Sequence, residues 1–128
     1  MKLLIDTSAF LWFLTSDPRL SETAAAAIRA PENDAWLSAV SFWEILVKHQ
    51  LGRLPLPEPP SSYVPKQRKR HGIQSLALRE KAMAHLPKLP SHHKDPFDRM
   101  LVCQAIVHGM AILTPDRLIA QYPVRTLW

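Results

Sequence analysis

The chain begins with a short apolar run that an acid interrupts. Residues 3–5 are Leu-Leu-Ile, Asp6 follows directly, and residues 9–14 form a second apolar block. Short apolar runs bounded by polar residues are typical of a buried strand or a short helix. We therefore expect a strand that ends at Asp6, a polar turn at Thr7 and Ser8, and then a short helix.

The rest of the chain alternates between strand-like and helix-like segments. Ser21 precedes an alanine-rich segment and is expected to cap a helix, because its side chain can accept the free amides of the first turn. Asp95 as cap, Pro96 at the first helical position and Gly109 at the end predict a strong helix between them. The expected helices cover residues 9–14, 21–30, 41–51, 61–71 (broken by Pro65), 78–86, 95–108 and a short one from 115; the expected strands cover 3–5, 35–38, 72–74, 110–114 and 124–127.

This alternation predicts an α/β fold with three layers, α/β/α, around a central, mainly parallel sheet. With 128 residues the chain has a common single-domain length, so residues 1–128 are expected to form one domain. Cys103 is the one cysteine, which suits a reducing compartment. The first apolar run is too short for a signal peptide, and no stretch approaches the ~18 apolar residues of a membrane span. We expect a cytoplasmic protein that does not contact a membrane.

Four acids lie at the ends of expected strands or at the starts of expected helices. Asp6 and Asp116 each follow the end of an expected strand, while Glu44 and Asp98 are expected in the first turn of a helix. In an open parallel sheet the carboxyl ends of the strands and the helix N-termini share one edge, and ligands bind there. The sequence therefore predicts that these four carboxylates converge in one pocket.

Four carboxylates in one pocket repel one another, and a bound divalent cation would offset the repulsion. Oxygen-only ligands suit Mg²⁺ or Mn²⁺, which commonly bind substrate phosphates as well. One or two ions are compatible with the pattern. The sequence thus points to phosphoryl-transfer chemistry.

Each acid except Asp6 also has a structural explanation. Ser41 and Glu44 match a capping box, Asp95 and Asp98 resemble one, and Asp116 can cap the helix expected after it. Asp6 has no such explanation, because an acid directly after a buried strand needs a partner. The functional interpretation depends on all four acids occurring together.

Charge is unevenly spread along the chain. Residues 1–60 carry five Lys/Arg and seven Asp/Glu, a net −2, whereas residues 61–128 carry eleven and four, a net +7. A basic half favours a polyanionic partner such as RNA, although an ordinary solvated surface has the same appearance. His92 and His93 could contact a phosphate, but we expect them to be exposed loop residues. The candidate RNA contacts, for which an exposed helix face is the alternative, are Lys66, Arg68, Lys69, Arg70 and Arg99.

The chain resembles the PIN-domain family, and specifically the VapC-like toxin ribonucleases of bacterial type II toxin–antitoxin pairs. The resemblance rests on LIDTS at 4–8, SFWEI at 41–45, HKDPFDRML at 93–101 and ILTPD at 112–116, and it covers nearly the whole chain. It implies an endoribonuclease dependent on Mg²⁺ or Mn²⁺. The family's catalytic and metal-binding acids would fall on Asp6, Glu44, Asp98 and Asp116, and its polar residues around the metal on Thr7, Ser8 and Thr114, with Asp95 as a helix cap beside them.

The resemblance also implies partners: a structured RNA substrate of the tRNA or rRNA class, a cognate antitoxin across the active-site groove, and a second copy in a homodimer. Two other functions remain open at this point. One is a non-catalytic module of the same fold that binds RNA or protein. The other is a different Mg²⁺-dependent phosphoryl-transfer hydrolase, such as an aspartyl-phosphate phosphatase, although that chemistry usually has a second acid where this chain has Ser8.

Overall fold

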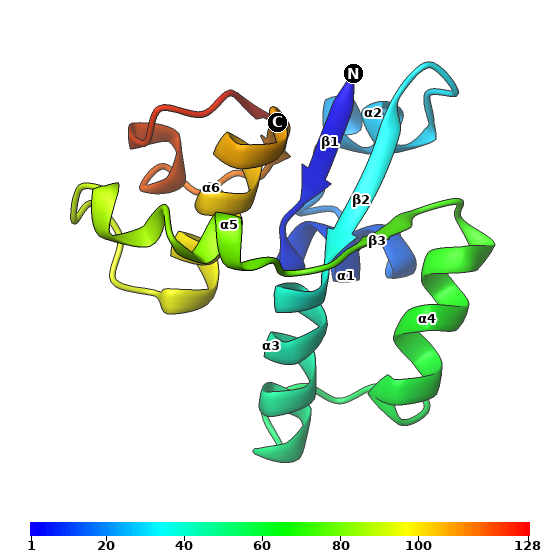
Figure 1. The fold of residues 1–128 in the computed structure, drawn as a ribbon. Coiled ribbons are helices and arrows are strands. Elements are labelled where there is room, and N and C mark those ends of the chain that lie inside the picture. The colour runs from blue at the N-terminus through cyan, green and yellow to red at the C-terminus, as the bar shows by residue number, and fades with distance from the viewer.

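The computed structural model describes residues 1–128 and is built around a five-stranded sheet (Figure 1). All strand pairs are parallel, and the order across the sheet is β3-β2-β1-β4-β5. The strands are β1 (Lys2–Ile5), β2 (Asp34–Ser38), β3 (Gln74–Leu76), β4 (Ala111–Leu113) and β5 (Thr126–Leu127).

Helices cover both faces of the sheet, and the predicted three-layer α/β/α architecture is confirmed. Figure 1 shows α5 and α6 on one side of β1 and α1, α2 and α4 on the other, with α3 extending from the end of β2. The helices are α1 (Thr7–Thr15), α2 (Glu22–Arg29), α3 (Ala39–Gln50), α4 (Pro60–Arg70), α5 (Glu80–Met83) and α6 (Pro96–His108), with 3₁₀ turns at Leu86–Lys88 and Ile119–Gln121. None of these helices combines the length and apolarity needed to cross a membrane.

The central strand β1 is buried on both faces. Leu3 and Ile5 pack into one apolar cluster with Phe10 of α1, while Leu4 packs into a second cluster with Leu101 of α6. A parallel strand covered by helices on both sides carries apolar residues in succession, without the alternation of a half-exposed strand. This explains the apolar run at residues 3–5.

Several predicted boundaries were wrong. Helix α4 is continuous from Pro60 to Arg70 and is not broken at Pro65. Pro65 lacks the backbone N–H for one helical hydrogen bond, but the helix continues past it. The strand expected at 72–74 is β3, two residues later. The helix expected over 78–86 is only α5 followed by a 3₁₀ turn, in a segment interrupted by Pro87 and Pro90, and the helix expected from 115 is the 3₁₀ turn Ile119–Gln121.

Candidate active site

Strand register places Asp6 beside Thr114. Ile5 of β1 pairs with Leu113 of β4, so the residues that follow the two strands are neighbours at the carboxyl edge of the sheet. Asp6 caps α1, and its Oδ1 accepts the Ala9 amide at 2.7 Å, while its Oδ2 accepts the Thr114 hydroxyl at 2.5 Å. Burial outweighs these hydrogen bonds and raises the pKa of Asp6 above its usual value, and nearby carboxylates raise it further.

Glu44 reaches the same edge from α3, which follows β2 without a loop. Ser38 ends the strand and caps the helix, because its Oγ accepts the Val40 amide at 2.9 Å. Glu44 is therefore in the second turn of α3, and both the predicted first-turn position and the capping box with Ser41 were wrong. The Glu44 side chain is buried, and its Oε1 accepts the Thr7 hydroxyl at 2.7 Å. Its burial beside a residue of α1 is not explained by helix capping.

Lys48 is a site residue that the sequence analysis missed. Its Nζ donates to Glu44 Oε2 at 2.5 Å from one turn further along α3, and this contact raises the pKa of Lys48. The four-residue spacing between a glutamate and a lysine on a helix was the available signal. Lys48 supplies a positive charge at an otherwise acidic site.

Asp95 and Asp98 both belong to the start of α6. Asp95 Oδ1 accepts the Phe97 amide at 2.8 Å and the Asp98 amide at 3.2 Å, so the prediction that Asp95 caps this helix is confirmed. An edge-on contact of the Phe97 ring with Trp43, 4.7 Å between centroids, fixes the N-terminus of α6 against α3. Burial, and then the charges of Asp95 and Glu44, raise the pKa of Asp98 to about 7.

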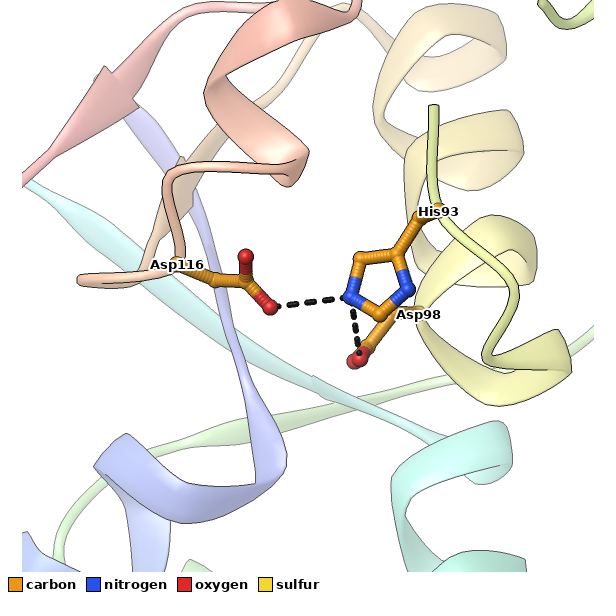
Figure 2. A group of neighbouring side chains, drawn as sticks. All are labelled: His93, Asp98 and Asp116. Atoms are coloured by element: carbon orange, nitrogen blue, oxygen red, sulfur yellow. Dashed lines mark hydrogen bonds and ion pairs between the residues drawn. The ribbon is translucent and has the colours of Figure 1, made fainter. Parts of the chain in front are cut away.

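Asp116 and His93 complete the cluster (Figure 2). Asp116 Oδ1 accepts the amides of Leu118 at 2.8 Å and Ile119 at 3.4 Å, so Asp116 does cap the following turn. His93 Nε2 lies 2.9 Å from Asp116 Oδ2 and 3.2 Å from Asp98 Oδ2. The His93 side chain is only 12% exposed, so the prediction of an exposed loop histidine was wrong for this residue. Partial burial would raise the pKa of Asp116, but the His93 contact and the backbone amides lower it on balance.

These side chains surround one cavity of about 300 Å³. The four acids singled out from the sequence are all in its wall, together with Asp95, Thr7, Ser8 and Lys48. Thr114 lies behind the wall and acts through Asp6. The full lining is Asp6, Thr7, Ser8, Trp12, Glu44, Lys48, Asp95, Asp98, Pro115 and Asp116.

The chemistry of this lining fits a hard divalent cation. Five carboxylates face one lysine, and the raised pKa values of Asp6 and Asp98 show that the cavity destabilises their charged forms. A cation among them would favour ionisation, and carboxylate oxygens are the ligands that Mg²⁺ and Mn²⁺ prefer. Asp6, Glu44, Asp98 and Asp116 are the residues that could hold such an ion.

The basic residues proposed as RNA contacts lie elsewhere. The C-terminal half of α4 contains Lys66, Arg68, Lys69 and Arg70, and none of them lines the acidic cavity. Lys66 pairs with Glu58 at 2.8 Å, and Arg68 Nη1 donates to the Ile73 carbonyl at 3.1 Å.

Arg99 also lies outside the cavity lining. Its Nη1 donates to the carbonyls of Pro90 at 3.1 Å and His93 at 3.4 Å, and to the Tyr122 hydroxyl at 3.3 Å. The RNA contact expected of Arg99 stays a prediction, but the hydrogen bonds give this side chain a structural role in the loop before α6.

Comparison with known proteins assigns this arrangement to one family. The sequence pattern of the family described as "PIN domain" matches residues 3–124. Ribonuclease VapC16 of Mycobacterium tuberculosis (strain ATCC 25618 / H37Rv) is 42% identical over 72 residues, which are 53% of this chain and 51% of that protein. Ribonuclease VapC22 of the same organism is 28% identical over 130 residues, which cover 98% of this chain and 97% of the relative.

Solved structures share the fold over the full length at low sequence identity. A chain of VapBC2 from Rickettsia felis, bound to a DNA fragment from its promoter, superimposes with a TM-score of 0.74 at 12% identity, covering 99% of this chain and 98% of that one. A chain of FitAcB from Neisseria gonorrhoeae gives a TM-score of 0.63 at 18% identity, covering 98% and 96%. These similarities establish the fold alone.

Proposed function

This chain belongs to the PIN domain family, and on that premise we propose that it is a metal-dependent endoribonuclease that serves as the toxin of a toxin–antitoxin pair. The observation that carries the proposal is the gathering of Asp6, Glu44, Asp95, Asp98 and Asp116 around one cavity at the carboxyl edge of the parallel sheet. The names of the two curated relatives, both ribonucleases, support RNA as the substrate. A non-catalytic module would have no need for so many partly buried carboxylates that repel one another.

The acids would hold one or two Mg²⁺ or Mn²⁺ ions. When bound, such an ion polarises a phosphoryl oxygen and lowers the pKa of a water molecule. The chain's own residues orient the ligands: Thr114 and the Ala9 amide fix the Asp6 carboxylate, and Thr7 fixes Glu44. Lys48, beside Glu44 and in the wall of the cavity, is placed to offset charge on a phosphate group.

The substrate we propose is a structured RNA of the tRNA or rRNA class, hydrolysed at a phosphodiester bond. The net +7 charge of residues 61–128 supports a polyanionic substrate. The basic side chains of α4 lie outside the cavity, so they would contact RNA away from the scissile bond.

The partners we propose are a cognate antitoxin and a second copy of the chain. A similar solved structure, a toxin–antitoxin complex from Klebsiella pneumoniae, supports the antitoxin as a partner. The homodimer is implied by the family resemblance alone.

Substitution of the acids tests the catalytic proposal. Asp6→Asn and Asp98→Asn should each lower RNA cleavage by at least ~100-fold, because an amide is a much weaker ligand than a carboxylate for a hard cation. Cleavage is measured on total RNA in Mg²⁺, in Mn²⁺ and in a chelator, with circular dichroism to verify folding. The matched control is Asp34→Asn, an exposed acid at the amino end of β2, which should cleave like the wild type. Full metal-dependent activity in both site variants would exclude the assignment.

Induced expression in bacterial cells tests the toxin role. Growth should stop when the wild type is expressed, and sequencing of RNA 5′ ends should show cleavage at defined positions in tRNA or rRNA. Asp98→Asn should leave growth and RNA ends unchanged. Co-expression of a candidate antitoxin should restore growth. Growth arrest by Asp98→Asn as strong as that of the wild type would exclude a nuclease toxin.

A further inference from the structure

His93 is held in one orientation by contacts at its backbone and its ring. Its amide donates to the Tyr122 hydroxyl at 2.8 Å, and its carbonyl accepts from Arg99 Nη1 at 3.4 Å. Its ring nitrogen Nδ1 accepts the Asp95 amide at 3.1 Å, and its Nε2 faces Asp98 and Asp116 (Figure 2). A rotation of the ring by half a turn would put carbon atoms at both positions and lose both polar contacts.

The Asp95 amide decides which ring nitrogen carries the proton. A backbone N–H can only donate, so Nδ1 must present its lone pair to it. The single proton of a neutral imidazole is then on Nε2 and points at Asp98 Oδ2 and Asp116 Oδ2. The tautomer of His93, with its proton on Nε2, is therefore set by the backbone amide of Asp95 and does not depend on which neighbouring side chains are protonated.

This tautomer is the opposite of the one a metal ligand needs. A ligating histidine turns a lone pair toward the ion and donates its other ring N–H to a neighbour. Ligand atoms of His93, Asp98 and Asp116 lie within 4.8 Å of one another, which by distance alone is compatible with a three-residue metal site. The hydrogen bond at Nδ1 argues against that site, because it leaves no lone pair on Nε2.

We propose that His93 is a positioning residue: its Nε2–H holds Asp98 Oδ2 and Asp116 Oδ2 close together and so orients both carboxylates toward a cation that His93 itself does not touch. This inference rests on the proposed metal-dependent function and adds the residue that sets the ligand geometry. It also makes the cation site oxygen-only, which suits Mn²⁺ and Mg²⁺ better than Zn²⁺.

Binding of Mn²⁺ without RNA tests the proposal separately from nuclease activity. The Mn²⁺ affinity is measured by loss of the free-ion electron paramagnetic resonance signal, and directly bound nitrogen by pulsed measurement of ¹⁴N coupling. The wild type should bind Mn²⁺ with no directly coordinated nitrogen. His93→Ala should weaken binding by about 10–100-fold, as removal of groups that orient metal ligands commonly does. His93→Gln, whose amide N–H can reach the same oxygens, should recover most of the affinity.

The control is His71→Ala, an exposed histidine at the end of α4, which should bind Mn²⁺ like the wild type. A ¹⁴N coupling typical of a direct ligand in the wild type would overturn the proposal, and so would unchanged affinity in His93→Ala. If His93→Ala does not fold, the wild-type coupling and the His93→Gln affinity still decide it. Mn²⁺ binding as expected, without RNA cleavage, would refute the proposed function but not the role of His93.

Discussion

The Thr114 hydroxyl, behind the wall of the cavity, links the Asp6 carboxylate to the backbone amide of Asp116. Its Oγ1 donates to Asp6 Oδ2 and accepts the Asp116 amide at 3.1 Å, and the side chain is buried. Thr114→Val keeps the shape and removes both hydrogen bonds. We expect it to lower the free energy of unfolding at pH 7 by about 1–3 kcal/mol, because a buried carboxylate loses a donor.

Thr114→Ser is the matched control, since it keeps the hydroxyl and loses only a methyl group. Both variants are compared with the wild type by urea denaturation at pH 7 and pH 4. The cost of Thr114→Val should shrink at pH 4, because the hydroxyl stabilises the charged form of Asp6 and protonation weakens that contribution. An equal cost at both pH values would mean that the loss comes from packing.

Residue-level chemistry also explains which site residues the sequence could identify. Asp6 was identifiable because an acid directly after a buried strand needs a partner, but the expectation that it has no capping role was wrong, since it caps α1. His93 was not, because a loop histidine gives no sign of what lies opposite it; here Asp116, 23 positions away, determines its environment. Lys48 had a local signal, its four-residue spacing from Glu44. That spacing points to the site only once Glu44 is known to be buried there.

At the scale of elements, the cap of α6 sets both the stability of the helix and the charge of the site. Asp95 Oδ1 accepts two first-turn amides, and its charge is one of the causes of the raised pKa of Asp98. Asp95→Ala should cost about 1 kcal/mol of unfolding free energy through loss of the cap. Asp95→Asn keeps the capping oxygen and removes the charge, so it should be at least as stable as the wild type at pH 7 without metal. Urea denaturation measures both, and equal destabilisation of the two variants would contradict this division of roles.

Local sequence signals were sufficient to predict a helix where the residues that cap or end it are recognisable in the sequence. Asp95, Pro96 and Gly109 marked α6 correctly, and Ser21 marked α2. The start of α3 was misplaced because Ser38 and Ser41 are both suitable caps by sequence. Only the direct passage from β2 into the helix selects Ser38, and strand pairing in β2 depends on residues distant in sequence. Tertiary contacts therefore decided what local propensity left open.

At the scale of the molecule, the parallel sheet makes the site predictable in outline. The four acids of the site lie far apart in the chain, yet each lies just after a strand or near the N-terminus of a helix at the same edge of the sheet. They are Asp6, Glu44, Asp98 and Asp116. The rule that parallel strands end at one edge was enough to bring the acids together. The partners of each acid were beyond this rule, because they depend on side-chain packing between α1, α3 and the loop before α6.

The same gathering of charge predicts how the stability of the metal-free protein depends on pH. The raised pKa values of Asp6 and Asp98 mean that the folded protein binds more protons than the unfolded chain between about pH 4, the ordinary carboxyl pKa, and about pH 7, the pKa of Asp98. The free energy of unfolding in a chelator should therefore fall as pH rises through this window. Asp98 alone should contribute on the order of 3 kcal/mol. Asp98→Asn should flatten the profile, and an equally steep profile in that variant would contradict the assignment.

Bound cation should reverse this dependence, because ionised carboxylates are its ligands and ligand binding to the folded state adds stability. At pH 7.5, Mn²⁺ at ~100 times its dissociation constant should stabilise the wild type by about 2.7 kcal/mol. The increase should shrink as pH falls below 7, since protons then compete with the ion for Asp98. Thermal denaturation with and without Mn²⁺ measures this stabilisation, and the same pair of measurements on Asp98→Asn gives the reference. Equal stabilisation of wild type and Asp98→Asn would show that the ion binds somewhere other than the acidic cavity.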